Sequence, residues 1–273
     1  MTALLVTVGW LDLLSTIVLA GGYISAMLIA PPSRDGRRAI QWAAVLLATT
    51  LLAELAVNAV RMAAISSTAG LVFVEEMLGT RWCQLWFARC AGLALLLLLR
   101  VGSRPAAAVA AFWLALRSLQ GHAGAHGTFP AVIDWVHLLA AVSWLGSLLQ
   151  LALLRGATPL IIAERVRRLA TIAVVAVVPA GLYGAFLHIP SLDRLVNSPY
   201  GRTLLVKLSL AAVLLCLGAA NHFRYVPALL RHRDSAAQRQ LRRVVRWEVV
   251  IAVLVILMSA LLGVLPMPHA MPQ

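Results

Sequence analysis

Charge is scarce in this sequence, and negative charge is the scarcer kind. Only 12% of the 273 residues are charged, with 10 acidic side chains against 23 basic ones. A typical soluble domain has about 25% charged residues, whereas 62% of this chain is hydrophobic. These proportions exclude an ordinary soluble globular protein, because too few polar side chains are present to cover its surface. The chain is therefore predicted to be an integral membrane protein.

Cysteine pairs and catalytic signatures are also missing. Cys83, Cys90 and Cys216 lie in or beside apolar runs without a CxxC spacing, so neither a disulfide framework nor a zinc site is indicated. No GxxxxGK[ST], HExxH or GxSxG pattern occurs, which argues against an ATPase or a common hydrolase. The basic residues form no soluble face interleaved with aromatic side chains, so nucleic acid is not an expected partner. We expect a protein that is not an enzyme.

The sequence does contain apolar runs of about the 20 residues that a membrane-spanning helix needs. Eight runs come close to this length: 4–30, 39–61, 83–99, 105–120, 132–154, 168–188, 203–223 and 245–265. The fourth is the shortest and is the one expected to be tilted or to stop short of the far side. No separator is long enough for a soluble domain. No cation precedes the first run, so a cleaved signal peptide is not expected.

The expected fold is an all-α bundle of about eight transmembrane helices in a single domain, residues 1–273. Residues 1–120 hold the first four runs and residues 121–273 the last four. Sixteen of the 23 cations lie in the connections after the first, third, fifth and seventh runs. Because Lys and Arg concentrate in cytoplasmic loops, both termini are predicted to face the outer side.

This topology gathers most of the histidines, together with two methionines, on the outer side. The candidate metal ligands there are His122, His126, His137, His188, Met267, His269 and Met271. Imidazole and thioether groups suit copper, especially Cu(I), and are poor ligands for Mg or Ca. The sequence therefore predicts an outer copper site. The alternative interpretation is that these are loop and interfacial histidines beside a terminal tail without function.

A second set of polar residues lies inside the apolar runs, where ionisable groups normally face a partner or a water-filled path. Glu54, Asn58 and Arg61 follow each other at i, i+4 and i+7, which places them on one face of a helix. Arg89 in the third run is a candidate partner for Glu54. This set indicates either an ion path or a structural ion pair between two helices, and the sequence leaves both open.

Two segments in the second half of the chain carry a more specific pattern. One contains SLQGHA, beginning at Ser118, and then DWVHLLAAVSWLG, ending at Gly146. The other contains YGRTLLVK, then GAANHFRYVP, and then the stretch from Arg243 to Glu248 before the last apolar run. Together they resemble the copper resistance protein D (CopD/PcoD) family of bacterial inner-membrane proteins. The first four runs match that family only in hydropathy and number.

The resemblance implies a multi-pass, permease-like protein of the bacterial inner membrane that serves copper uptake from the periplasm or copper tolerance. It implies copper ion as the bound metal. Besides the lipid bilayer, the implied partner is a small periplasmic copper-binding protein of the CopC type, supplied by another chain. By position, the family's outer histidines fall on His122 and His137, and its polar signature falls on Lys207, Asn221, Arg224 and Glu248.

Three functions follow from these observations. The leading hypothesis is a permease that captures periplasmic copper at the outer histidines and moves it toward the cytoplasm. The second is a membrane b-type cytochrome, in which His137 and His188 would be the two axial ligands of a haem b. The third is a docking or assembly protein for a periplasmic copper carrier, which would bind metal without transporting it.

Overall fold

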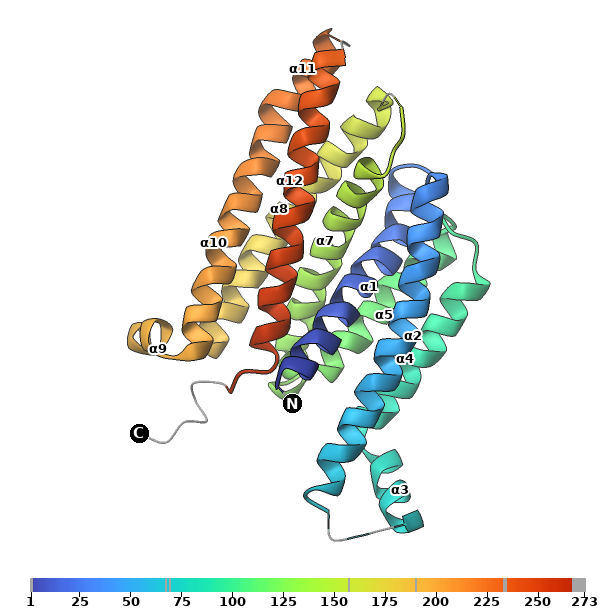
Figure 1. Ribbon diagram of the computed structural model, residues 1–273, viewed down its shortest axis with the longest axis vertical. Coiled ribbons are helices and arrows are strands. Elements are labelled where there is room, and N and C mark those ends of the chain that lie inside the picture. Colours follow the sequence, from blue (N-terminus) through green and yellow to red (C-terminus); the bar gives the residue numbers. More distant parts are fainter. Residues whose placement is uncertain are drawn as a thin grey trace.

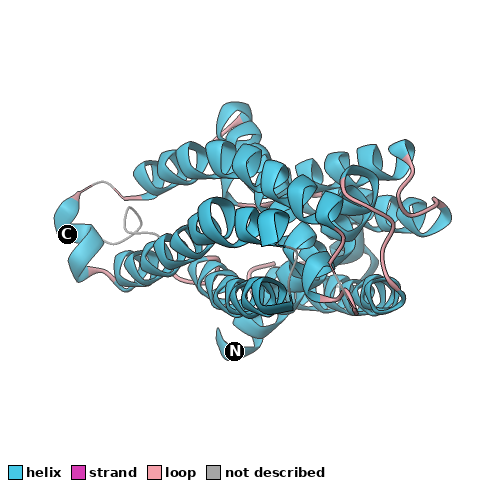
Figure 2. Cartoon of the chain, turned by 90° about the horizontal axis from the view of Figure 1, so that it is seen from above, coloured by secondary structure: helices cyan, strands magenta, loops and turns pink. Residues whose placement is uncertain are grey.

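A computed structural model shows an all-helical protein. It describes residues 2–66, 68, 70–156, 158–189, 191–232 and 235–266, without the side chains of His122 and His232. No strand occurs within these ranges, and helices joined by short loops make up the whole described chain (Figure 2). The predicted all-α class is therefore confirmed.

Within the described residues, six helical segments are long and apolar enough to cross a membrane. They are α1 (Thr2–Leu28), α2 (Arg34–Ala63), α7 (Thr128–Ala152), α8 (Leu160–His188), the segment Pro199–Arg231 and α12 (Ser235–Leu262). The third and fourth predicted runs form α4 (Arg81–Leu98) and α5 (Arg104–Gln120), which have 18 and 17 residues. In the bundle (Figure 1), α5 packs against α1, α4 and α7, and α4 packs against α5 and α2, but neither helix meets the length and hydropathy of a full crossing. A count of eight crossings therefore stays a prediction.

The two ends of the bundle differ in their connections. Short helices α3 (Gly70–Gly79) and α9 (Leu192–Asn197) lie at the end where α1 begins and α12 finishes (Figure 1). The short helix α6 (His122–Ala125) connects α5 to α7. The opposite end holds the cation-rich connections. The first and last helices thus share one end of the bundle, and the assignment of that end to the outer side rests on the positive-inside rule.

Serine caps and prolines explain where several helices begin. The hydroxyl of Ser103 accepts a hydrogen bond from the backbone N–H of Ala106, and that of Ser198 accepts one from Gly201 at 2.9 Å. Pro105 comes two residues after Ser103 and Pro199 comes directly after Ser198, both in the first turn where a missing N–H costs nothing. The separators identified in the sequence are therefore also the start signals of α5 and α10.

The segment after α9 changes its helical pitch partway. α10 (Pro199–Ala220) continues into a π-helical turn, η1 (Asn221–Tyr225), and then into α11 (Val226–His232). The wide turn ends two residues before Pro227, which has no N–H to donate to the carbonyl four residues earlier. Such π turns are rare and frequent at functional sites. Here the turn begins at Asn221, a buried residue.

Buried apolar residues form two clusters, one in each half of the bundle. The first lies mainly among α1, α2, α4 and α5 and includes Leu19, Leu47 and Trp113. The second lies mainly among α7, α8, α10, α11 and α12 and includes Leu148 and Leu241. Each half therefore has its own apolar core, and contacts between α1 and α7 connect the two.

The connection between the halves depends on two glycines where α1 crosses α7. A Cβ at Gly146 would lie 2.5 Å from the Cα of Gly21, and one at Gly21 would lie 2.6 Å from the carbonyl oxygen of Val142. No side chain fits at such distances. Small residues let the backbones of membrane helices approach closely. The resulting van der Waals contacts stabilise the helix pair, because the hydrophobic effect does not drive helices together inside lipid.

Candidate metal site and buried polar clusters

His126 and His188 meet at the end of the bundle where α1 begins. His126 follows the short helix α6, and His188 is the last residue of α8. Their ring centroids are 5.5 Å apart and their planes are perpendicular. The ring of Tyr200 stacks on His188 at 6.2 Å, which brings the start of α10 to the same place. The structure thus brings together two of the histidines that the sequence assigned to an outer site.

His137 belongs to α7 and contacts α8 at a different level, nearer the middle of that helix. Its Nδ1 lies 3.0 Å from the carbonyl oxygen of Val177, whereas Nδ1 of His188 lies 2.6 Å from that of Gly184. These two carbonyls are seven residues apart on α8, or about 10 Å along the helix axis. The arrangement does not favour His137 and His188 as ligands of one haem iron, because each metal–imidazole bond is only about 2 Å long.

Both imidazoles are oriented by backbone contacts. A carbonyl oxygen can only accept a hydrogen bond, so each contact places the ring proton on Nδ1 and leaves Nε2 as the acceptor atom. Metal-ligating histidines usually donate their other ring N–H to a carbonyl or carboxylate in this way, which holds the ligating nitrogen in place. His137 and His188 each show this contact between Nδ1 and a backbone carbonyl.

The full set of predicted ligands is not tested by the structure. Met267, His269 and Met271 lie outside the described residues, as does the side chain of His122. Within the part of the chain that is described, no three His, Cys, Asp or Glu side chains gather closely enough to hold one metal ion. The observed geometry is therefore a pair of histidines near the surface, with a third imidazole deeper in the bundle.

A network of buried charges joins the four helices of the first half. Arg89 is 2% exposed and donates to Asp12 and Glu54, both at 2.9 Å. It also donates to Gln120 at 2.7 Å, and Arg117 pairs with the second oxygen of Asp12. Trp113 donates its indole N–H to the carbonyl of Arg89, and the Arg89 guanidinium lies 5.7 Å from the centre of that ring.

The predicted pairing of Glu54 with Arg89 is thus formed, but its neighbours on α2 do not join it. Asn58 donates only to the sulfur of Met62, one turn along the same helix, at 3.8 Å. Arg61 is exposed. The sequence missed Arg117, which sits in the run that it judged least certain. The pairing of Asp12 with Arg117 was also missed, because helix spacing shows which residues share a face but not which helices meet.

Further charged residues of opposite sign connect this network to the second half of the bundle. Asp134 in α7 interacts electrostatically with Arg117, with His137 and with Lys207 of α10. Three carboxylates, Asp12, Glu54 and Asp134, therefore face three cations. All six charges lie within ten residues of their helix ends on the side of His126, or about 15 Å. Lys207 thus belongs to this balanced cluster, next to His137.

A second buried polar cluster lies in the middle of α12. Glu248 is 1% exposed, and its carboxylate accepts a hydrogen bond from the amide of Asn221, which is 8% exposed. Among the described residues, the other oxygen of Glu248, the Asn221 carbonyl oxygen and the Trp144 indole N–H have no partner. A Cβ at Gly218 would lie 3.5 Å from this Glu248 oxygen and 3.3 Å from the Trp144 ring, so these groups share one space.

This space is a cavity of about 30 Å³ between α7, α8, α10 and α12. It is large enough for one water molecule. A single water could donate to both oxygens and accept from the indole, which would satisfy all three groups. The resemblance placed Asn221 and Glu248 in one polar signature, and the structure shows that the two side chains are hydrogen-bonded to each other. Arg224 of the same signature is exposed and lies against Tyr225 instead.

Comparisons with known proteins connect this chain with copper. The family model for copper resistance protein D matches residues 160–262, from α8 to the end of α12. The copper transport protein CutJ of Bacillus subtilis (strain 168) is 33% identical over 165 residues, which are 57% of this chain and 29% of that relative. The chain thus spans less than a third of the relative's length. No solved structure matches it.

The matched range contains one of the two histidines that meet and both members of the buried carboxylate–amide pair. His188, Asn221 and Glu248 lie within residues 160–262, whereas His126 and His137 precede it. Together with the six apolar helices, these matches identify a copper-related, multi-pass membrane protein. Over residues 160–262, the chain is similar to the copper resistance protein D family.

Proposed function

We propose that this protein is a permease of the bacterial inner membrane that captures copper at its periplasmic end and moves it toward the cytoplasm. The observation that carries this proposal is the contact between His126 and His188 at one end of the bundle. Two imidazoles on separate elements supply ligands that copper prefers. The family match and the name of the relative support copper as the metal.

In this proposal the capture site has further ligands close by in the sequence. His122 belongs to the same connection as His126, and Met267, His269 and Met271 would be the first contact that hands copper to the histidines. A small periplasmic protein of the CopC type, supplied as a separate chain, is the proposed donor. The protein is proposed to bind and move the ion without catalysing a reaction.

The inward route would run through the second half of the bundle. The next imidazole is that of His137 in α7, which contacts α8 about 10 Å farther along that helix. The neighbouring Asp134 offsets the charge of Lys207 there. Beyond it, the cavity at Glu248 and Asn221 offers oxygen atoms without partners in the middle of the membrane-spanning helices. An ionisable residue at such depth normally serves a substrate or ion pathway, or a structural pair.

The direct test is the copper content and visible spectrum of the detergent-purified protein, with and without added copper. We expect about one copper ion per chain and no Soret band, because the proposed site holds copper and no haem. The double variant His126→Ala/His188→Ala should lose the copper. His232→Ala, which removes a histidine of α11 at the other end of the bundle, is the matched control and should keep it.

A strong Soret band with little copper would instead make the protein a b-type cytochrome, and unchanged copper in the double variant would remove these histidines from the site. Transport needs its own measurement, which is copper entry into proteoliposomes that contain the purified protein. Copper bound at the histidines without entry into the vesicles would contradict the permease and support a docking protein for a periplasmic carrier.

A further inference from the structure

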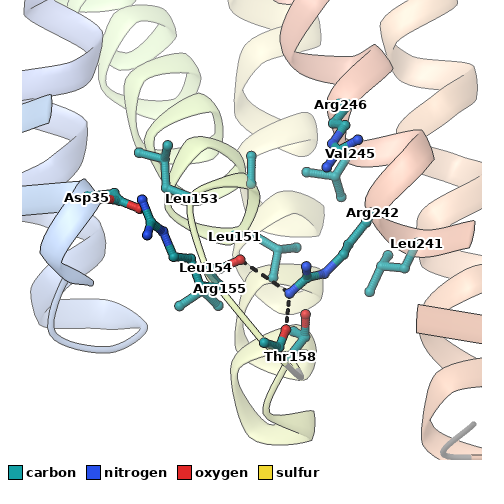
Figure 3. A pocket seen from close by; sticks show the side chains of 12 residues that line it. Asp35, Leu151, Leu153, Leu154, Arg155, Thr158, Leu241, Arg242, Val245 and Arg246 are labelled. Carbon is teal, nitrogen blue, oxygen red and sulfur yellow. Dashed lines mark hydrogen bonds and ion pairs between the residues drawn. The ribbon is translucent and has the colours of Figure 1, made fainter. Parts of the chain in front are cut away.

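A cavity lies at the cation-rich end of the bundle, opposite His126 and His188. It has a volume of about 360 Å³ and lies between the connection from α7 to α8, the start of α2 and the first half of α12 (Figure 3). Its charged lining residues are Asp35, Arg155, Arg242 and Arg246. None of these took part in the copper proposal.

The cavity has a surplus of positive charge. Asp35 is the acidic residue of its lining, and it is already paired with Arg155. The ion pairs found among the described residues include none with Arg242 or Arg246. Two cations therefore face this space without a carboxylate to balance them.

The wall also has hydrogen-bond donors that lack an acceptor. One terminal nitrogen of Arg242 donates to the carbonyls of Leu154, at 3.2 Å, and Gly156, and this holds the guanidinium against the wall (Figure 3). Its Nε is buried and has no partner in the described structure. The same is true of the hydroxyl of Thr158, which is 6% exposed. Leaving such buried donors unsatisfied is costly.

Unpartnered donors and unbalanced cations in one cavity require a ligand rich in acceptors and negative charge. We propose that this cavity binds a phosphate group, held by Arg242, Arg246 and Thr158. A phosphate carries several acceptor oxygens, and its hydrogen bonds with arginine are among the strongest in proteins. Leu151, Leu241 and Val245 line the rest of the cavity and suit the apolar part of a lipid.

Two sources of phosphate share this chemistry. The positive-inside rule assigns this end of the bundle to the cytoplasmic surface, where basic pockets between membrane helices bind anionic lipid headgroups. Free phosphate in the cytoplasm is the other source. In either case the bound group ties the α7–α8 connection to α12. This site does not depend on the proposed copper function, because it involves other residues at the opposite end.

The test measures binding to the full chain, purified in a neutral detergent. Short-chain phosphatidylglycerol and inorganic phosphate are added separately, and the midpoint of thermal unfolding is followed against concentration. We expect saturable stabilisation of the wild type. Arg246→Gln and Thr158→Val should each weaken the apparent affinity, by about tenfold or more for the arginine. Arg243→Gln removes an equal charge from an exposed position outside the cavity lining and should bind like the wild type.

The two probes separate the sources. Stabilisation by phosphatidylglycerol alone identifies a lipid headgroup, and stabilisation by inorganic phosphate identifies a site for the free ion. Stabilisation by neither probe overturns the proposal, as does equal affinity of Arg246→Gln, Thr158→Val and Arg243→Gln. Arg246 is exposed and Thr158 makes no hydrogen bond in the described structure, so neither variant is expected to prevent folding.

Discussion

The two halves of the bundle differ in how many hydrogen-bond partners surround their buried charged side chains. In the first half, Arg89 is surrounded by Asp12, Glu54 and Gln120, and only its Nε lacks a partner. In the second half, Glu248 has a single amide partner and faces an open cavity. A network with nearly every group satisfied makes a core rigid and specific. A half-satisfied carboxylate leaves room for another occupant.

The difference bears on the open question about Glu54. The sequence allowed an ion path or a structural pair on α2. Four helices meet at Arg89 through direct hydrogen bonds, and Asn58 and Arg61 do not extend the polar surface along α2. The geometry therefore favours the structural interpretation for the first half. Movement of an ion is better supported in the second half, where the family match also lies.

Removal of Arg89 should break the paired half and have the largest effect. Arg89→Met is expected to lower the free energy of unfolding by about 3–5 kcal/mol, because the buried Asp12 loses one of its two arginine partners and the partly buried Glu54 loses its ion pair. The measurement is folded yield and thermal midpoint in detergent. Arg61→Met, at an exposed position on α2, should behave like the wild type. A normal yield for Arg89→Met would mean that the network contributes little to stability.

The contact between the halves can be tested at Gly146. Gly146→Ala should destabilise the protein by about 1–3 kcal/mol, because its methyl group would force α1 and α7 apart. Gly184→Ala is the matched control, since a Cβ there meets no atom within 4 Å. That change should be neutral or stabilising by up to about 1 kcal/mol. Equal thermal midpoints for the two variants would contradict the close crossing.

Replacement of Glu248 tests the second half of the bundle, where we expect copper transport to fall while the free energy of unfolding changes little. Glu248→Gln keeps the shape and the contact with Asn221, so the unfolding free energy should change by less than about 1 kcal/mol. Copper entry into proteoliposomes should fall about tenfold or more. A Gln150→Glu variant would not serve as a control, because it would also remove the hydrogen bond that the Gln150 amide donates to the carbonyl of Ala30. Trp144→Phe, which removes the indole N–H together with part of the buried ring but keeps the Glu248 carboxylate, separates the role of the cavity from that of the charge.

If Glu248→Gln collapsed the folded yield while copper entry per folded molecule stayed normal, the carboxylate would be structural, like those of the first half.

The smallest effect is expected from the tail. Removal of residues 266–273 should slow copper capture severalfold at limiting copper, because the proposed first contact is lost. Copper bound at saturation should stay the same, since His126 and His188 remain. Equal rates of capture would show that Met267, His269 and Met271 have no part in the function.

Much of the bundle could be predicted from the sequence because each feature is local. Apolar runs locate the helices, since a backbone in lipid must satisfy its own hydrogen bonds. Serine caps and prolines mark their beginnings, as at Ser103 and Ser198. The pairing of Glu54 with Arg89 was foreseen because so few charges lie in the first runs that candidate partners are few.

The parts that sequence reasoning missed depend on how helices are rotated and crossed. Nothing in the local pattern links Asp12 with Arg117, 105 positions later. Nor does it show that Trp144 and Gly218 enclose the cavity at Glu248, or that Asn58 faces its own helix. Such contacts need the neighbouring helix at a particular depth and angle, and those are set by packing at points such as Gly21 and Gly146.

By itself, the sequence determined that this is an all-helical membrane protein with a cation-rich end, and that residues in its second half resemble a copper resistance family. These properties follow from composition and local spacing. Only the tertiary structure decided which histidines meet and which buried charges are balanced. It also decided where buried hydrogen-bond donors without a partner in the described structure line a cavity. Those outcomes depend on contacts between residues far apart in the chain, because buried polar groups are satisfied by whichever side chain the helix packing brings near.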